Sequence, residues 1–174
     1  MVDIEIYEDT GSVTSSHGSI RTIVTNYNWK SSGDITIPYY LAPLHRPADN
    51  TELTCSYTKY LYFKISGTFT KAKNFKIILS AVPGLNTQLF GALTNTYTVP
   101  DNSLNGNLQY ISSPITLYPR IGGDPSTAST VDAVVSTGTY YTEYLATQLR
   151  VNNSNDYDIG NTADLTIQLL LSEY

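Results

Sequence analysis

The side chains that could carry out chemistry are few in this chain. His17 and His45 are its two histidines, and both stand in polar stretches typical of loops. Nucleophilic catalysis usually needs a base beside the nucleophile, so these two residues are the histidine candidates for that role. Cys55 is the single cysteine, and no helix is evident nearby whose N-terminus could activate its thiol. We interpret both histidines as surface residues and Cys55 as an inert, partly buried thiol.

Oxygen ligands gather in one stretch, NNSNDYDIGN, where Asp156 and Asp158 stand two residues apart among asparagines. Calcium prefers such hard oxygen donors, but the closing glutamate and the spacing of an EF-hand are missing. Asn and Asp also form turns through hydrogen bonds of their own side chains. We favour a polar loop without metal, and calcium binding is the alternative.

Two further kinds of enzyme site find no support. A glycosidase needs two carboxylates that face each other across a cleft, whereas most acids here, Asp9 among them, stand near the termini or in turns, where we expect them to be solvated. In RIGGDPSTAST the glycines are followed by Pro125 and small polar residues and not by a helix, so this is no phosphate-binding loop. We predict no catalytic residue, no cofactor and no metal, and hence no enzyme.

Composition narrows the choice of partners. The net charge is -5, and charged residues make up only 14 % of the chain. Binding to phosphates needs clustered Lys and Arg, so we expect no nucleic acid partner. No stretch approaches the roughly 18 consecutive apolar residues of a membrane span, and the acidic start MVDIEIYEDTG lacks the pattern of a secretory signal. A lone cysteine cannot form an internal disulfide, so the fold does not depend on an oxidising compartment.

The elements that must position any site are strands. In TKYLYFKISGTFT the residues Leu61, Phe63, Ile65 and Phe69 alternate with Tyr60, Tyr62 and other polar residues, the period of a half-buried strand. Residues 165–171 alternate in the same way, and we expect Leu165, Ile167 and Leu169 to share a core with the first row. Residues 71–74 have the length of a hairpin loop that leads into FKIILSAV. The proline-containing stretch 34–47 is expected to be an edge strand running into a loop.

Strand-like segments recur along the whole chain, and no amphipathic helix with capping residues is evident. A chain of 174 residues suits one domain. We therefore predict a single domain over residues 1–174 with an all-β fold, a two-sheet antiparallel β-sandwich with jelly-roll-like connections. The order of the strands is left open.

Tyrosine is unusually frequent, with 15 residues against one Trp and four Phe. Tyrosine joins a large apolar ring to a polar tip, which is why binding surfaces and subunit contacts use it. The alternative is strand propensity alone, with tyrosines covering a sheet face. We predict that Tyr60 and Tyr62 form an exposed patch and that the tyrosine face is an interface, whose candidate residues are Tyr60, Tyr62, Tyr140, Tyr141 and Tyr144.

The chain resembles, in style, a family of small virion structural proteins of tailed bacteriophages, the jelly-roll capsid decoration (cement) proteins. The resemblance lies in low charge, in richness in Thr, Asn and Tyr, and in segments such as VTNYNWKSSG, YYTEYLATQLRVNN and the terminal ADLTIQLLLSEY. It implies an oligomer, commonly a homotrimer, that is made in the host cytoplasm and docks on the major capsid protein at the outside of the virion. No diagnostic motif carries over a residue role.

Three other functions stay open. A glycan-binding β-sandwich module of a fibre or adhesin would also expose aromatic rings, although a single Trp, Trp29, weakens this alternative. A capsid shell protein often carries a basic arm toward the genome, whereas this N-terminus is acidic. An enzyme is the least supported of the three.

Metal independence is the first testable prediction. Because the loop with Asp156 and Asp158 is interpreted as a turn, a chelator should leave the melting temperature unchanged in a thermal denaturation experiment. A ligand that binds only the folded state raises its stability. An increase of several degrees on addition of calcium would contradict the prediction and identify the loop as a metal site.

Overall fold

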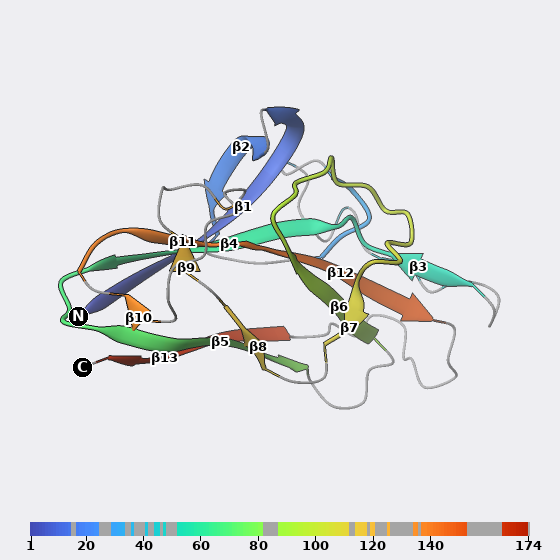
Figure 1. Ribbon diagram of the computed structural model, residues 1–174. Helices are drawn as coiled ribbons and strands as arrows, with labels where there is room; N and C mark the ends of the chain where they lie inside the picture. Colours follow the sequence, from blue (N-terminus) through green and yellow to red (C-terminus); the bar gives the residue numbers. More distant parts are fainter. Residues whose placement is uncertain are drawn as a thin grey trace.

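Figure 1 shows a computed structural model of the protein. Over the described residues, it contains no helix that is long and apolar enough to cross a membrane. The residues described are 1–14, 17–24, 29–33, 36, 41, 44–45, 47, 52–81, 87–111, 114–117, 119–120, 125, 134–135, 137–152 and 165–173. The predicted all-β, antiparallel fold is confirmed over these ranges.

Over the described residues the chain forms two sheets. The larger has nine strands there, and its main path runs in the order β2-β1-β4-β12-β6-β7. Three short strands add to it: β11 pairs with β4, β9 pairs with β11, and β3 pairs with β12. The strands are β1 (Val2–Thr14), β2 (His17–Ile23), β3 (Leu53–Cys55), β4 (Lys59–Gly67), β6 (Thr87–Thr94), β7 (Gln109–Tyr110), β9 (Pro119–Arg120), β11 (Tyr140–Thr142) and β12 (Tyr144–Asn152).

The smaller sheet, as far as the described residues show it, has four strands and lies along one face of the larger sheet (Figure 1). Its centre is β5, which pairs with β10 and β13 on the main path and with β8 off this path. All of these pairings are antiparallel. The strands are β5 (Ala72–Ala81), β8 (Ile115–Thr116), β10 (Val134–Val135) and β13 (Leu165–Glu173).

Side-chain hydroxyl groups replace missing backbone partners where the ladders of the larger sheet are irregular. At the end of β11 the backbone N–H of Phe63 on β4 donates to Thr142 Oγ1 at 3.0 Å. Between β3 and β4 the N–H of Leu149 donates to Ser56 Oγ at 3.0 Å. Both hydroxyl-bearing residues are fully buried, so each bond satisfies a donor that would otherwise be buried without a partner.

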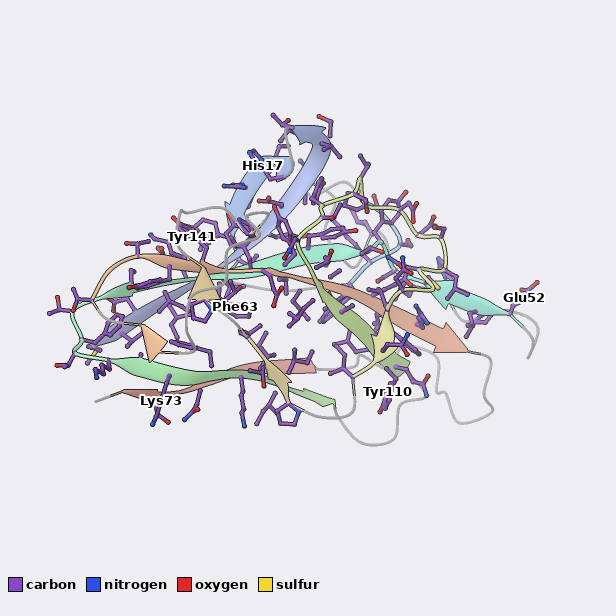
Figure 2. The ribbon with its side chains drawn as sticks, viewed as in Figure 1. His17, Glu52, Phe63, Lys73, Tyr110 and Tyr141 are labelled. Atoms are coloured by element: carbon purple, nitrogen blue, oxygen red, sulfur yellow. The ribbon has the colours of Figure 1, made fainter. Side chains whose placement is uncertain are left out.

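One apolar core lies between the two sheets. The predicted row of Leu61, Phe63, Ile65 and Phe69 on and after β4 is confirmed, since all four belong to one buried cluster. Figure 2 shows Phe63 pointing from the larger sheet toward the smaller one. The other members of this cluster are Ala72, Phe75 and Ile77 of β5, Leu117 and Leu145.

The second predicted row lies on β13, where the backbone of Leu165, Ile167 and Leu169 pairs with Ala81, Leu79 and Ile77 of β5. The side chains of this row are outside the described residues, so their place in the core stays a prediction. Most of the proline-containing stretch 34–47 is also outside them.

The predicted hairpin at residues 71–74 is wrong. β4 belongs to the larger sheet and β5 to the smaller one, so the chain changes sheets here instead of turning back on its own strand. Gly67 allows this departure because its φ of 109° is one that side-chain-bearing residues rarely adopt. Phe69 and Ala72 on either side of the crossing are buried in the shared core, and this burial stabilises the crossing over a local hairpin.

Asn74 has a φ of 60°, in the left-handed region, and it lies beside the register shift between β5 and β13. Its side chain is exposed, so substitution tests the backbone alone. Asn74→Val should lower the free energy of unfolding by roughly 1–2 kcal/mol, because a β-branched residue is strained in this conformation. Asn74→Gly should cost little or nothing. Urea unfolding of the two variants checks this, and equal stabilities would contradict a left-handed backbone at position 74.

Candidate functional site: the tyrosine face

The alternation of β4 places tyrosines on the side of the larger sheet that faces away from the smaller sheet. Tyr60 and Tyr62 point to this side because Leu61 and Phe63 point into the core between the sheets. Tyr7 is the register partner of Tyr62 on β1, and Ala146 of β12 is the partner of Tyr60. We call this surface the tyrosine face, defined by Tyr7, Tyr60, Tyr62, Tyr97, Tyr141 and Tyr144.

The six rings are in continuous contact. Tyr60 is 4.9 Å from Tyr97 between ring centroids and 5.8 Å from Tyr144. Tyr62 is 5.7 Å from Tyr144 in an edge-to-face arrangement, and it stacks on Tyr7 at 5.3 Å with an interplanar angle of 11°. Tyr141 lies 6.1 Å from Tyr62. Edge-to-face and offset-stacked pairs are the favourable geometries for aromatic rings, so the cluster is a second core of the protein.

The predicted exposure of this face is wrong for its central residues. Tyr60, Tyr62 and Tyr144 are only 3 %, 1 % and 0 % exposed, so the ordinary burial of a sheet face explains them. Tyr141 is half-buried, and Figure 2 shows it on the side of the sheet opposite Phe63. Tyr140 is half-buried and packs against the core between the sheets. A partner contact at Tyr140 or Tyr141 stays a prediction.

The hydroxyl groups of the buried tyrosines have partners of different basicity. Tyr97 donates to the backbone carbonyl of Gly11 at 2.8 Å, which ties the segment after β6 to the bend of β1. Tyr60 shares a hydrogen bond with the hydroxyl of Thr98. Tyr144 donates to the carboxylate of Asp9, with 2.5 Å between Oη and Oδ2. Burial raises the pKa of the phenols of Tyr62 and Tyr97, so both rings are neutral at physiological pH.

Asp9 was expected to be solvated, and this expectation is wrong, because its side chain is 0 % exposed. Its Oδ2 accepts from Tyr144 and, at 3.3 Å, from the backbone N–H of Gly18. Its Oδ1 lies 3.2 Å from Nε of Arg21, close enough for an ion pair but not aligned as a hydrogen bond. Burial raises the pKa of the Asp9 carboxyl, and the hydrogen bond from Tyr144 and the charge of Arg21 partly oppose this rise.

The position of Asp9 follows from strand pairing that a single sequence does not reveal. Asp9 pairs with Tyr60 on one side and with Arg21 on the other. Arg21 thereby reaches both the carboxylate and the ring of Tyr62, 5.6 Å from its guanidinium carbon to the ring centroid. Asp9 and Arg21 carry opposite charges and stand twelve positions apart in the sequence. This spacing of opposite charges is the one signal that could have indicated the pair.

Two ion pairs follow β1 and β4 beside this cluster. Lys64 Nζ lies 2.5 Å from Glu5 Oε2, and Lys59 Nζ lies 2.9 Å from Glu8 Oε1. The hydrogen bond between Glu5 and Lys64 lowers the pKa of Glu5 and raises that of Lys64. Three of the four acids of β1 thus have cationic partners, and the fourth, Asp3, is exposed.

A second buried polar group ties a loop to β12. Gln148 Nε2 donates to the backbone carbonyls of Ser56 at 3.1 Å and of Ser103 at 2.7 Å. Arg150 Nη2 donates to the carbonyl of Asn105 at 2.6 Å, and its guanidinium stacks 3.7 Å above the ring of Phe90. Burial lowers the pKa of Arg150. The partners are mostly backbone carbonyls within the chain, so this group is structural.

The other chemical candidates are not brought together. His17 Nδ1 bonds to the Gly18 carbonyl at 2.8 Å, whereas His45 is exposed. Cys55 is buried, and burial raises the pKa of its thiol. That this thiol is inert stays a prediction. In the described part of the chain no group of three or more His, Cys, Asp or Glu could hold a metal ion. Asp156 and Asp158 lie outside the described residues.

The bond between Tyr144 and Asp9 should stabilise the fold. Tyr144→Phe keeps the ring but leaves a buried carboxylate with one donor fewer, so we expect the free energy of unfolding to fall by about 1–3 kcal/mol. Tyr141→Phe is the matched control from the same cluster and should change it by less than about 0.5 kcal/mol. Chemical denaturation of both variants makes the comparison. Equal effects would show that the bond contributes nothing.

The raised pKa of Asp9 predicts a pH dependence of stability. Folded Asp9 binds a proton more tightly than unfolded Asp9, whose pKa is about 4. The wild-type chain should therefore lose stability relative to Asp9→Asn as the pH rises through the interval between the unfolded and the folded pKa. Urea unfolding of both proteins from about pH 4 to neutrality measures this. Parallel stability curves would refute it.

Comparisons with known proteins give no information on the role of this site. No protein-family model matches the chain, and neither a curated protein nor a solved structure matches it. The role of the tyrosine face must therefore follow from its own contacts.

Proposed function

We propose that the protein is a virion structural protein of the capsid decoration type, which self-associates and docks on a major capsid protein lattice. The proposal includes a jelly-roll-like β-sandwich and a trimeric assembly. Low charge, an antiparallel all-β fold and two buried cores are compatible with such a role. The observation that carries the proposal is a hairpin with exposed aliphatic side chains.

This docking hairpin consists of the second half of β1 and of β2, and it projects from the rest of the larger sheet (Figure 1). Val13, Ile20 and Ile23 on it are 50 %, 46 % and 50 % exposed. Val13 pairs with Gly18, so it shares a face of the hairpin with Ile20 two residues on. Aliphatic side chains that gather on a projecting element favour contact with another protein.

Buried contacts hold the docking hairpin together and tie it to the tyrosine face. Gly18 and Arg21 of β2 contact the Asp9 carboxylate of β1 within the hairpin, while Tyr144 donates to Asp9 and Tyr97 donates to the Gly11 carbonyl from outside it. An isolated two-stranded hairpin is at best marginally stable in water. These contacts therefore preorganise the hairpin, which lowers the entropic cost of docking.

Glycan binding is the second candidate, and one observation favours it. The half-buried rings of Tyr7 and Tyr141 lie on either side of Tyr62 at the outer part of the tyrosine face. Aromatic rings in such positions could stack on a sugar. A glycan array without binding across the broad sugar classes would remove this candidate and leave the docking proposal untouched.

Self-association through the docking hairpin is tested by the double substitution Val13→Ser and Ile20→Ser. Both side chains are about half exposed, so we expect little change in folding stability but a shift toward monomer in analytical ultracentrifugation. Leu104→Ser, at a residue 58 % exposed and outside the hairpin, is the matched control and should leave assembly unchanged. A wild-type chain that stays monomeric at high concentration, and that does not co-sediment with capsids, would refute the proposal.

A further inference from the structure

The tyrosine face combines a chain of contacting rings with a buried proton acceptor at one of them. We propose that it is a redox-active site in which Tyr144 is oxidised by one electron while its phenolic proton passes to Asp9. The electron leaves through Tyr62 and then Tyr7 or Tyr141 to an outer-sphere one-electron oxidant at the surface, of the class of high-potential metal complexes. This inference is independent of the docking hairpin and of self-association.

Proton transfer decides which tyrosine is oxidised. A neutral phenol that loses an electron inside a protein becomes a strong acid, and burying the resulting cation in a medium of low dielectric constant is costly unless the proton leaves. The carboxylate of Asp9 lies 2.5 Å from Tyr144 Oη, within the hydrogen-bond reach that proton transfer requires. Because burial raises the pKa of Asp9, its carboxylate is also a better base than an exposed one.

The other buried tyrosines lack such an acceptor. Tyr97 donates to a backbone carbonyl, and Tyr60 shares its hydrogen bond with a threonine hydroxyl. Neither group is a useful base near neutral pH. Tyr62 lies under the guanidinium of Arg21, whose positive charge disfavours a hole on this ring. Tyr7 also has a carboxylate partner, Glu5 Oε2 at 3.4 Å, but the hydrogen bond from Lys64 lowers the pKa of Glu5 and makes this carboxylate the weaker base. The lowest-energy oxidised state of the cluster therefore places the radical on Tyr144.

A path of rings joins Tyr144 to the surface. Tyr144 contacts Tyr62 at 5.7 Å, and Tyr62 contacts Tyr7 at 5.3 Å and Tyr141 at 6.1 Å between centroids. Tyr144 itself is 0 % exposed, whereas Tyr7 and Tyr141 are half-buried. An oxidant in solution can thus reach the outer rings but not Tyr144, and the buried radical is shielded from solvent.

The step balances without a bound cofactor. The oxidant gains one electron, the O–H bond of Tyr144 breaks, and an O–H bond forms on Asp9 Oδ2. The products are a neutral tyrosyl radical, a neutral carboxylic acid and the reduced oxidant. Return of one electron from a reductant, with return of the proton to Tyr144, restores the starting state. The site thus stores one oxidising equivalent inside the fold.

The experiment uses the full chain with a photogenerated ruthenium(III) polypyridyl complex as the oxidant. Electron paramagnetic resonance of freeze-quenched samples should show a tyrosyl radical, and transient absorption should follow its formation and decay. Tyr144→Phe keeps the ring packing and should abolish the long-lived radical. Asp9→Asn should slow formation of the radical by roughly 10²-fold, the lower range for loss of a positioned base.

Tyr140→Phe is the matched control, because Tyr140 packs against the other core, and this variant should behave as wild type. If circular dichroism shows that Asp9→Asn does not fold, the rate of radical formation in the wild-type chain is measured in heavy water instead. This rate should be lower than in ordinary water, because proton transfer is coupled to the oxidation. A long-lived radical that survives in Tyr144→Phe, or a wild-type signal that arises from Trp29, would overturn the proposal. Formation rates that respond to neither Asp9→Asn nor heavy water would overturn it as well.

Discussion

The burial of the Asp9 carboxylate is the constraint on which the placement of the hairpin of β1 and β2 against the larger sheet depends. A buried charge is costly unless it is paired and hydrogen-bonded. Here the compensation comes from Gly18 and Arg21 on β2 and from Tyr144 on β12. Strands from the two ends of the chain must therefore meet at one point, and the position of the hairpin relative to the sheet follows from this meeting.

The same sheet is buried on both faces by two different kinds of side chain. Leu61, Phe63 and Ile65 meet the smaller sheet, where neighbouring groups are apolar. Tyr60, Tyr62 and Tyr144 meet a layer of loops and hairpin backbone. Loop backbone brings carbonyl groups that need donors, and a tyrosine can cover apolar surface while its hydroxyl serves such a group, as Tyr97 does at Gly11. The abundance of tyrosine in a chain of low charge thus has a structural explanation.

How much of this could be predicted from the sequence depends on the range of the interaction. The apolar row on β4 follows from period-two alternation, a local property, and it was predicted correctly. The hairpin at residues 71–74 was not, because the choice between turning back and crossing to another sheet depends on burial of Phe69 and Ala72. The burial of Tyr60 and Tyr62 depends on what covers the second face of the sheet. Asp9 was misplaced for the same reason, since its partner on β12 is 135 residues away.

These long-range contacts also connect the two proposals without making them depend on each other. Tyr97, Asp9 and Arg21 make buried contacts of the docking hairpin, while Tyr144, Tyr62 and Tyr7 form the path of rings, and Asp9 belongs to both groups. The aliphatic side chains of the hairpin point into solvent and take no part in the ring contacts. A change at Asp9 would therefore affect both proposed properties, whereas a change at Val13 or Ile20 would affect the proposed docking alone. A change at Tyr144 that keeps the ring would remove the oxidisable phenol and also one donor to the buried Asp9 carboxylate. In the two proposals the Asp9 carboxylate has two roles. It anchors the docking hairpin to the tyrosine face, and it accepts the proton of Tyr144.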